Sequence, residues 1–280
     1  MNTLIKCMTS CKQARLVFAD TSDLLSSGIA NRELSAGVAI ALARLLTIAG
    51  LTTGFMKDKE RVTYTIRGSQ RELALIAEAD DMGRVSGYAN EACRALVLGE
   101  HELEMLIGPK AYLQVIRDIG MPVRFTGIAD MPYGTVTDDA AHFYTQSEQT
   151  PTRFWTTEQW TSDAQLFGRG VAIQLLPGAP AALLQDLMGQ LEAHERQVAD
   201  PNLPLSRLPH HLFGITEMVT QAGVQWHCDC SRELFSPMLY TLDRTELEQA
   251  IHDSTSIEFV CHRCGTCYAF TADEIAGCLE

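Results

Sequence analysis

The sequence predicts an α+β fold in three parts: a mixed helix-and-sheet domain over residues 1–176, a helical, proline-containing linker over 177–224, and a small four-cysteine domain over 225–280. Three observations predict this division. Strand-like segments follow one another in the first half of the chain, with helical segments grouped apart from them. The run PGAP at 177–180 strongly favours a turn that ends the preceding element. Two close cysteine pairs occur near the C-terminal end.

Composition narrows the class of protein. A chain of 280 residues can bury a full core and is long enough for one main domain and a smaller one. Its net charge of −13 argues against a large phosphate-neutralising surface, so we expect no nucleic-acid partner. Nine cysteines, clustered towards the C-terminus, suit metal or redox chemistry better than a secreted disulfide framework. Residues 1–22 lack the apolar core of a signal peptide, and we expect a cytoplasmic protein.

Residues 34–51, LSAGVAIALARLLTIAGL, are apolar over nearly the length needed to span a membrane. Arg44 lies near the centre, and the segment is rich in alanine and glycine. We therefore interpret it as a buried core helix within a longer helical stretch, 20–56, and expect no membrane association. Gly50 and Gly54 favour the end of that helix.

The strands of the first domain are predicted from alternation and from β-branched residues. Residues 61–67, RVTYTIR, show both features most clearly, and residues 72–80 and 84–89 suit a hairpin about the turn at 81–83. Further strands are expected at 15–18, 103–107, 111–117, 123–130 and 171–176.

Two helices are expected later in the chain. Residues 140–149 predict a helix that Pro151 ends, and we interpret His142 on it as a packed rather than a catalytic histidine. Residues 181–199 predict an amphipathic helix. The segment 200–214 is rich in proline and also apolar, so we expect it to pack against another part of the protein rather than remain free in solvent.

The strongest chemical signal is a pair of cysteine pairs. Cys228 and Cys230 are separated by thirty residues from Cys261 and Cys264. Each pair can supply two thiolates from one tight turn, and the chain between them can fold back, so the spacing predicts a four-cysteine site for one zinc ion. In a tetrahedral site with Zn–S bonds of about 2.3 Å, the sulfurs lie about 3.8 Å apart.

The same four sulfurs can serve either as a metal site or as two local disulfides. Without zinc, each close pair needs only a modest approach to reach an S–S distance of about 2.05 Å. A peroxide could convert one thiolate to a sulfenic acid that its neighbour resolves. From the spacing alone, a permanently closed structural zinc site is the more common interpretation.

Three neighbouring residues complicate the ligand set. Cys267 adds a second C-x-x-C, but the fourth cysteine of an iron–sulfur run is absent, so we expect Cys267 to point away as a small buried residue or a spare thiol. His227 and His262 flank ligand positions, and we expect neither to replace a cysteine. A strand is expected at 257–260. Two pairs of residues nearby have capping-box spacing at the start of a helix: Asp243 with Glu246, and Thr271 with Glu274.

Five segments of the chain carry a family resemblance: HCDCSRE (227–233), LDRTELEQ (242–249) and FVCHRCGTCYAF (259–270), with HFYTQSEQTPTRFW (142–155) and GVAIQLLPGA (170–179) upstream. They resemble the heat-shock protein 33 family, the redox-regulated holdase chaperones of the bacterial cytosol. It covers most of the chain in order, and the C-x-C plus C-x-x-C pair is highly specific.

The resemblance implies a chaperone, not an enzyme, that binds unfolding client proteins without ATP. It implies that one zinc ion is held by Cys228, Cys230, Cys261 and Cys264 in an inactive reduced form. Oxidation would then form the disulfides Cys228–Cys230 and Cys261–Cys264, expel zinc, and release the linker 177–224. The active species would be a homodimer. Cys267 departs from the family's four-cysteine pattern, so Cys264–Cys267 could compete.

Two other functions remain open from the residues. A thiol–disulfide oxidoreductase could use Cys261 with Cys264, or Cys264 with Cys267, although neither pair opens a helix after a strand. A zinc-stapled binding module for nucleic acid is disfavoured by the acidic charge. The run GRG at 168–170 lacks the Lys and Ser/Thr of a phosphate loop, so nucleotide binding is not expected.

Overall fold

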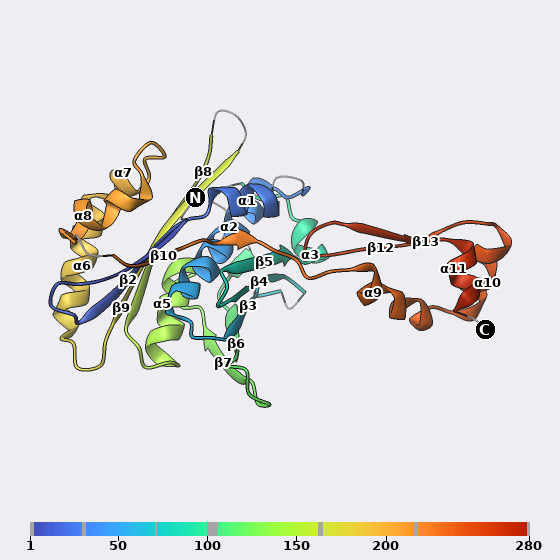
Figure 1. The fold of residues 1–280 in the computed structure, drawn as a ribbon, viewed down its shortest axis with the longest axis horizontal. Coiled ribbons are helices and arrows are strands. Elements are labelled where there is room, and N and C mark those ends of the chain that lie inside the picture. Colours follow the sequence, from blue (N-terminus) through green and yellow to red (C-terminus); the bar gives the residue numbers. More distant parts are fainter. Residues whose placement is uncertain are drawn as a thin grey trace. The chain divides into compact units, whose positions relative to one another are not determined.

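The chain divides into two compact units, Met1–His227, the core unit, and Cys228–Glu280, the cysteine unit (Figure 1). This computed structural model describes residues 3–29, 32–70, 72–99, 106–161, 165–215 and 218–278. Helices and separate sheets occur in both units, which confirms the predicted α+β class. The predicted boundaries at 176/177 and 224/225 stay predictions.

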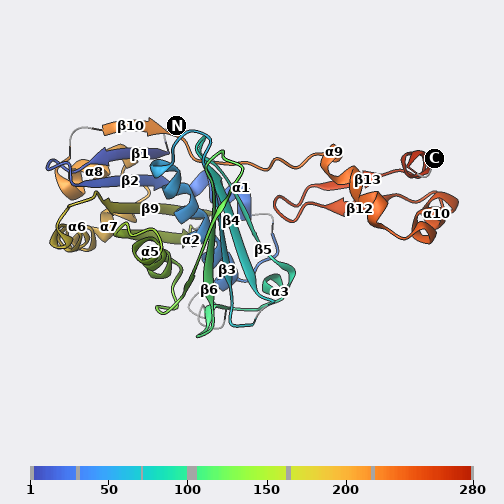
Figure 2. The same cartoon turned by 90° about the horizontal axis from the view of Figure 1, so that it is seen from below.

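The first sheet of the core unit is antiparallel and has five strands in the order β10-β1-β2-β9-β8 (Figure 2). Side chains alternate across β2: Val17 and Ala19 face one hydrophobic cluster, while Leu16 and Phe18 face another. Both faces of this sheet are therefore covered. The strands are β1 Leu4–Met8, β2 Ala14–Asp20, β8 Thr152–Trp160, β9 Leu166–Leu175 and β10 Met218–Ala222.

The second sheet has six strands in the order β11-β5-β4-β3-β6-β7, and only the β11–β5 pair is parallel. The predicted strand at 61–67 and the hairpin with its turn at 81–83 are confirmed. Of the strand expected at 103–107, residues 103–105 lie outside the described residues, and 106 and 107 are helical. The strands are β3 Arg61–Arg67, β4 Ala74–Asp80, β5 Arg84–Ala89, β6 Tyr112–Asp118, β7 Phe125–Asp130 and β11 Gln225–Trp226.

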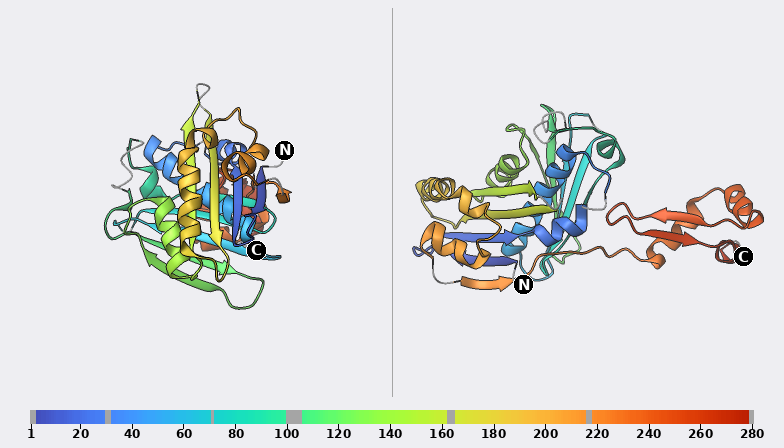
Figure 3. Two further views of the ribbon diagram at one scale, coloured as in Figure 1. Left: turned by 90° about the vertical axis from the view of Figure 1, so that its left-hand side faces the viewer. Right: turned by 90° about the horizontal axis from the view of Figure 1, so that it is seen from above.

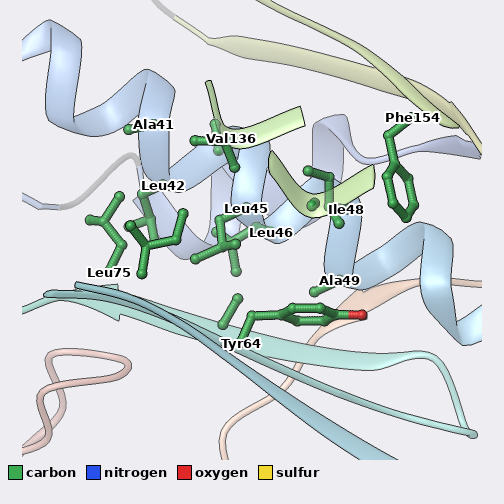
Figure 4. Close-up of a cluster of buried hydrophobic side chains, with 14 of the residues drawn as sticks. Ala41, Leu42, Leu45, Leu46, Ile48, Ala49, Tyr64, Leu75, Val136 and Phe154 are labelled. Atoms are coloured by element: carbon green, nitrogen blue, oxygen red, sulfur yellow. The ribbon is translucent and has the colours of Figure 1, made fainter. Parts of the chain in front are cut away.

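Helix α2, Ala36–Thr52, is the centre of the main hydrophobic cluster. Figure 4 shows its leucines, including Leu45, among Tyr64 and Leu75 of the second sheet and Phe154 of the first. By length and composition the segment Ala36–Phe55 could cross a membrane, but 83% of its apolar window is buried in the protein. The predicted core helix is thus confirmed, because a helix that is apolar on all sides has apolar neighbours on all sides.

Shorter helices complete this layer. Helix α5, Val136–Gln146, begins four residues before the predicted start, because Thr135 caps it by accepting a hydrogen bond from the Asp138 amide at 3.1 Å. The others are α1 Ser22–Ile29, η1 Thr53–Phe55 and α3 Glu91–Arg94.

The linker helices pack on the outer face of the first sheet (gold and orange in Figure 3). The single helix predicted at 181–199 is interrupted at His194, whose backbone leaves the helical region at φ −122° and ψ 16°. The expected packing of 200–214 is confirmed, since Leu205, Leu208 and Leu212 are buried against this sheet. The helices are α6 Ala181–Ala193, α7 Glu195–Val198, η2 Leu205–Arg207 and α8 Leu208–Phe213.

The cysteine unit has a two-stranded antiparallel sheet and short helices. The capping box of Thr271 and Glu274 is formed. The one expected at Asp243 is not, although a helix begins there: the Asp243 side chain makes no capping hydrogen bond. The elements are α9 Arg232–Phe235, η3 Ser236–Thr241, α10 Arg244–His252, β12 Ile257–Val260, β13 Cys267–Phe270 and α11 Ala272–Gly277.

Candidate metal centre

Four thiols meet in the cysteine unit. Cys228 and Cys230 lie in the extended stretch between β11 and α9, whereas Cys261 follows β12 and Cys264 lies in the turn before β13. Their four sulfurs all lie within 4.8 Å of one another. Residues more than thirty positions apart thus converge on one point, as the cysteine spacing predicts.

The sulfur separations fit a tetrahedral metal site. Cys228 Sγ is 3.7 Å from Cys261 Sγ, and Cys230 Sγ is 3.3 Å from Cys264 Sγ. Four sulfurs around zinc with bonds of about 2.3 Å would lie about 3.8 Å apart. All four are free thiols, so each can supply a thiolate ligand. The group could therefore hold one metal ion.

The second pair is positioned by a backbone turn. The Gly265 amide donates to the Cys261 carbonyl at 2.8 Å, and the Cys261 amide donates to the Thr266 carbonyl at 2.9 Å. Gly265 adopts a left-handed conformation, φ 76°, that favours glycine. The antiparallel pairing of β12 with β13 closes this turn, so Cys261 and Cys264 are held on one side of it.

Tyr268 is a contact that sequence reasoning missed. Its hydroxyl donates to Cys230 Sγ at 3.1 Å, and its ring stacks on Phe235 with centroids 5.0 Å apart. No local pattern indicated this contact, because Tyr268 and Cys230 are 38 positions apart. Tyr268 ties the first cysteine pair to the strand that follows the second.

An ion pair joins the segment just after the first cysteine pair to the last helix. Arg232, two residues after Cys230, contacts both carboxylate oxygens of Glu274 at 2.7 and 2.6 Å and lies 4.3 Å above the Phe270 ring. Glu274 also completes the capping box of α11 with Thr271. The last helix is therefore coupled to the segment that carries Cys228 and Cys230.

The thiols differ in acidity. Burial raises the pKa of Cys228 and of Cys230 above the ordinary value for a thiol. Burial also acts to raise the pKa of Cys264, but hydrogen bonds with Thr266 and the neighbouring cysteines outweigh it and lower the pKa to about 7. A metal that binds all four sulfurs would displace protons from the less acidic thiols.

The remaining candidates lie outside this cluster. Cys267 begins β13 and is exposed, so the expectation of a small buried residue is wrong and that of a spare thiol stands. Within the residues that the structure describes, neither His227 nor His262 joins the four-sulfur group. Cys7 and Cys93 are buried, which raises the pKa of each to about 11 and makes them poor nucleophiles.

Comparison with known proteins identifies the family. The profile of the family described as Hsp33 protein matches residues 2–271. The chain belongs to the Hsp33 family. A 33 kDa chaperonin of Clostridium novyi (strain NT) is 31% identical over 292 residues, which cover 99% of this chain and 97% of that protein. A 33 kDa chaperonin of Bacillus subtilis (strain 168) is 25% identical over 284 residues, which cover 99% of this chain and 98% of that protein.

The Hsp33 fold is also found in a crystal structure. The 33 kDa chaperonin (heat shock protein 33 homologue) from Thermotoga maritima matches 100% of this chain and 98% of its own, with a TM-score of 0.85 and 24% identity. The resemblance predicted from the cysteine motifs is therefore confirmed, and the fold extends over the full length of the Hsp33 chain.

Proposed function

We propose that this Hsp33 protein is an ATP-independent holdase chaperone whose client binding is switched on by oxidation. The single observation that carries the proposal is the group of four free thiols within 4.8 Å of one another in a unit with little other core. Family membership supports the chaperone activity, since the curated relatives are named 33 kDa chaperonins. The proposed setting is the cytoplasm, and the proposed active species is a homodimer.

In the reduced protein, Cys228, Cys230, Cys261 and Cys264 would hold one zinc ion. Zinc would supply about 10–16 kcal/mol of folding free energy to such a site. In the described part of the cysteine unit, residues 228–278, the apolar cluster has five buried side chains with partly buried ones around them: Leu239, Leu247, Ala250, Phe270 and Ile275. A unit of this size has little stability from burial alone. Metal binding would therefore supply most of the free energy that folds it.

Oxidation would convert the ligands into disulfides. One thiolate attacks hydrogen peroxide and breaks its O–O bond, which gives a sulfenic acid and releases hydroxide. The neighbouring thiol then attacks the sulfenic sulfur, and water leaves as the S–S bond forms. Each pair transfers two electrons to one peroxide, so two disulfides consume two peroxides. Thiolates that enter disulfides no longer bind metal, and the unit would lose its main source of stability.

The chain between the sulfurs favours Cys228–Cys230 and Cys261–Cys264 as the disulfides. Sulfur contacts of 3.7 and 3.3 Å join residues 33 and 34 positions apart, so closeness in the folded unit does not by itself select these pairs. Once the metal is gone and the unit loosens, closing a loop of three or four residues costs less entropy than closing one of more than thirty. Cys264–Cys267 has the same loop length as Cys261–Cys264 and would compete with it.

The linker, 177–224, would carry the signal to the sheets of the core unit. Arg169, 2% exposed, donates from Nη1 to the carbonyls of Val198, Asp200 and Leu203 at 3.3, 3.0 and 3.1 Å. Its Nη2 pairs with Asp20 at 2.8 Å. One buried guanidinium thus holds the turn after α7 against the first sheet, where α6 and α8 cover apolar side chains. Undocking of these helices would expose the apolar face that binds clients.

Light scattering from a heat-denatured client tests the proposal. We expect the peroxide-treated protein to suppress aggregation and the reduced zinc-bound protein to leave it almost unchanged. Zinc content and free thiols, measured on the same samples, should fall from one ion to none and by four thiols per chain. Equal suppression by both forms would contradict the switch, and suppression by neither would contradict the chaperone activity.

A thiol–disulfide oxidoreductase is the second candidate. The low pKa of Cys264 favours it, but the residues after Cys264 form a strand rather than the helix of thioredoxin-type enzymes. An insulin-reduction assay separates the two functions. Catalytic turnover with insulin, absent from a Cys264→Ser variant, would favour the enzyme.

A further inference from the structure

Residues 218–227, which we call the strap, lie along two sheet edges of the core unit. Its strand β10 pairs antiparallel with β1 at the edge of the first sheet (Figure 2). Strand β11 pairs parallel with β5 at the edge of the second sheet. The strap ends at His227, immediately before the first proposed zinc ligand, Cys228. It is therefore the part of the core unit that is covalently nearest to the cysteine unit.

Main-chain contacts hold the strap. The Thr3 hydroxyl accepts from the Val224 amide at 2.8 Å and donates to the Val224 carbonyl at 3.2 Å. The amides of Gln225 and His227 donate to the carbonyls of Gly83 and Val85, each at 2.9 Å. Backbone groups make the same hydrogen bonds whatever side chains they carry. The two edges can therefore hold extended chains of other sequences.

Side chains in the second half of the strap occupy apolar sites beside the edge of β5, whereas Met218 and Val219 of β10 are exposed. Val224 is buried. The Trp226 ring packs directly on Gly28, so closely that a β-carbon on this glycine would lie 2.5 Å from the ring. The Arg32 guanidinium lies 5.2 Å above the same ring. A groove of about 470 Å³ continues along the strap past Leu24. Alternate side chains of a replacement strand would find apolar contacts in the same places.

The opposite edges of the two sheets differ from those of β1 and β5, because the strap does not cover them. Strands β7 and β8 lie at the opposite edges and have no further strand beside them in the described structure. Phe125 and Ile128 on β7 are already 56% and 61% exposed. An edge that is open in the reduced protein cannot be what oxidation uncovers. The edges of β1 and β5 are covered by a segment that leads directly into the proposed switch.

We propose that the edges of β1 and β5, once the strap leaves them, bind extended segments of unfolded client polypeptide by strand addition. This inference rests on the proposed function. It assigns the clients a chemistry: an extended stretch, with apolar side chains at alternate positions, that completes the sheet through its backbone. Loss of the cysteine unit's fold frees the end of the strap, so the same oxidation that releases zinc opens both edges.

A peptide with the strap's own sequence, MVTQAGVQWH, is the probe, labelled with a fluorophore and added to the full-length protein. We expect fluorescence anisotropy to show binding to the oxidised protein at least about tenfold tighter than to the reduced protein. The bound peptide should also compete with a heat-denatured client in the light-scattering assay. Failure to bind the oxidised protein, or binding without competition, would overturn the proposal.

Two methylated peptides distinguish strand addition from ordinary apolar binding. N-methylation at the position of Gln225 removes the amide that donates to the carbonyl of Gly83, the residue just before β5, whereas the Trp226 amide points away from β5 by strand alternation. We expect the first peptide to bind at least about fivefold more weakly, which corresponds to about 1 kcal/mol, and the second to bind like the parent. Equal affinities of the two would refute strand addition. If the oxidised protein still protected the client, the proposed function would survive that result.

Discussion

The core unit and the cysteine unit differ in what holds them together. In the core unit, α2 is enclosed by side chains from both sheets, and a second cluster lies beneath the linker helices. In its described residues, the cysteine unit has an apolar cluster of five buried side chains and places four thiols within 4.8 Å of one another. Hydrophobic burial therefore accounts for the first unit, while the second has the composition of a unit that folds around a metal.

This difference explains how a chemical signal could act on one region alone. An oxidant that removed the proposed metal would leave a core of leucines unchanged, but it would take the proposed main source of stability from a unit with a small core. The linker helices and the strap join the two regions, because they pack on the sheets within the core unit and the chain continues from them to the cysteines. All three tryptophans, Trp155, Trp160 and Trp226, lie in the core unit, so their fluorescence reports on that unit separately.

The largest effect should follow metal removal. Treating the reduced protein with a strong zinc chelator should unfold the cysteine unit, which would lose about 10–16 kcal/mol of binding free energy. Hydrogen exchange should show lost amide protection in residues 228–278 and retained protection in the two large sheets. Cys261→Ser should behave like the chelated protein, and Cys267→Ser, which changes an exposed thiol outside the group, should not. Retained protection after zinc loss would remove the contrast between the units.

A cavity made in the core unit should destabilise that unit and leave the cysteine unit unchanged. Leu45→Ala on α2, where the leucine is fully buried, should destabilise the core unit by about 3–5 kcal/mol. Urea unfolding followed by tryptophan fluorescence measures the loss. Val97→Ala, at a side chain that is 92% exposed, is the matched control and should change little. Zinc content should stay at one ion in both variants, and zinc loss in Leu45→Ala would show that the units are not independent.

The buried guanidinium of the linker contact should give a somewhat smaller effect. Arg169→Met removes the donor for three carbonyls and the partner of Asp20, at a cost of about 2–4 kcal/mol in linker docking. Amide exchange around residues 198–205 should accelerate, and the reduced protein should suppress client aggregation partially. Arg207→Met, at an exposed linker arginine, should do neither. A reduced Arg169→Met protein without chaperone activity would argue against linker release as the activating step.

The smallest effect is a pH dependence of the free energy of unfolding of the core unit. Burial raises the pKa of Glu158 to about 7, although Arg44 at 3.2 Å opposes the shift. The folded state therefore binds more protons than the unfolded state between about pH 4.5 and 7, and stability contributed by this group falls as pH rises through that window. We expect a loss of about 1–3 kcal/mol between pH 5 and 8 that Glu158→Gln abolishes, measured by urea unfolding. Identical pH slopes for the two proteins would contradict the assignment.

Local patterns in the sequence determined a large part of this protein. Alternation in residues 61–67 and the turn at 81–83 place strands β3, β4 and β5, and Thr271 with Glu274 places the last helix. The spacing of the four cysteines identified the candidate metal centre before any geometry was known. These features depend on residues within a few positions of one another, or on the chemistry of one residue type, so they can be read from the chain.

Only the tertiary structure decided which distant residues meet. It brings Tyr268 to Cys230, Arg169 to the carbonyls after α7, and the strap to the edges of β1 and β5. Arg169 lay in a segment that the sequence indicated only as unsuited to nucleotide binding. Such contacts depend on strand register and on how helices pack over a sheet. These are set by the burial of the whole core at once, and no local stretch of sequence encodes them.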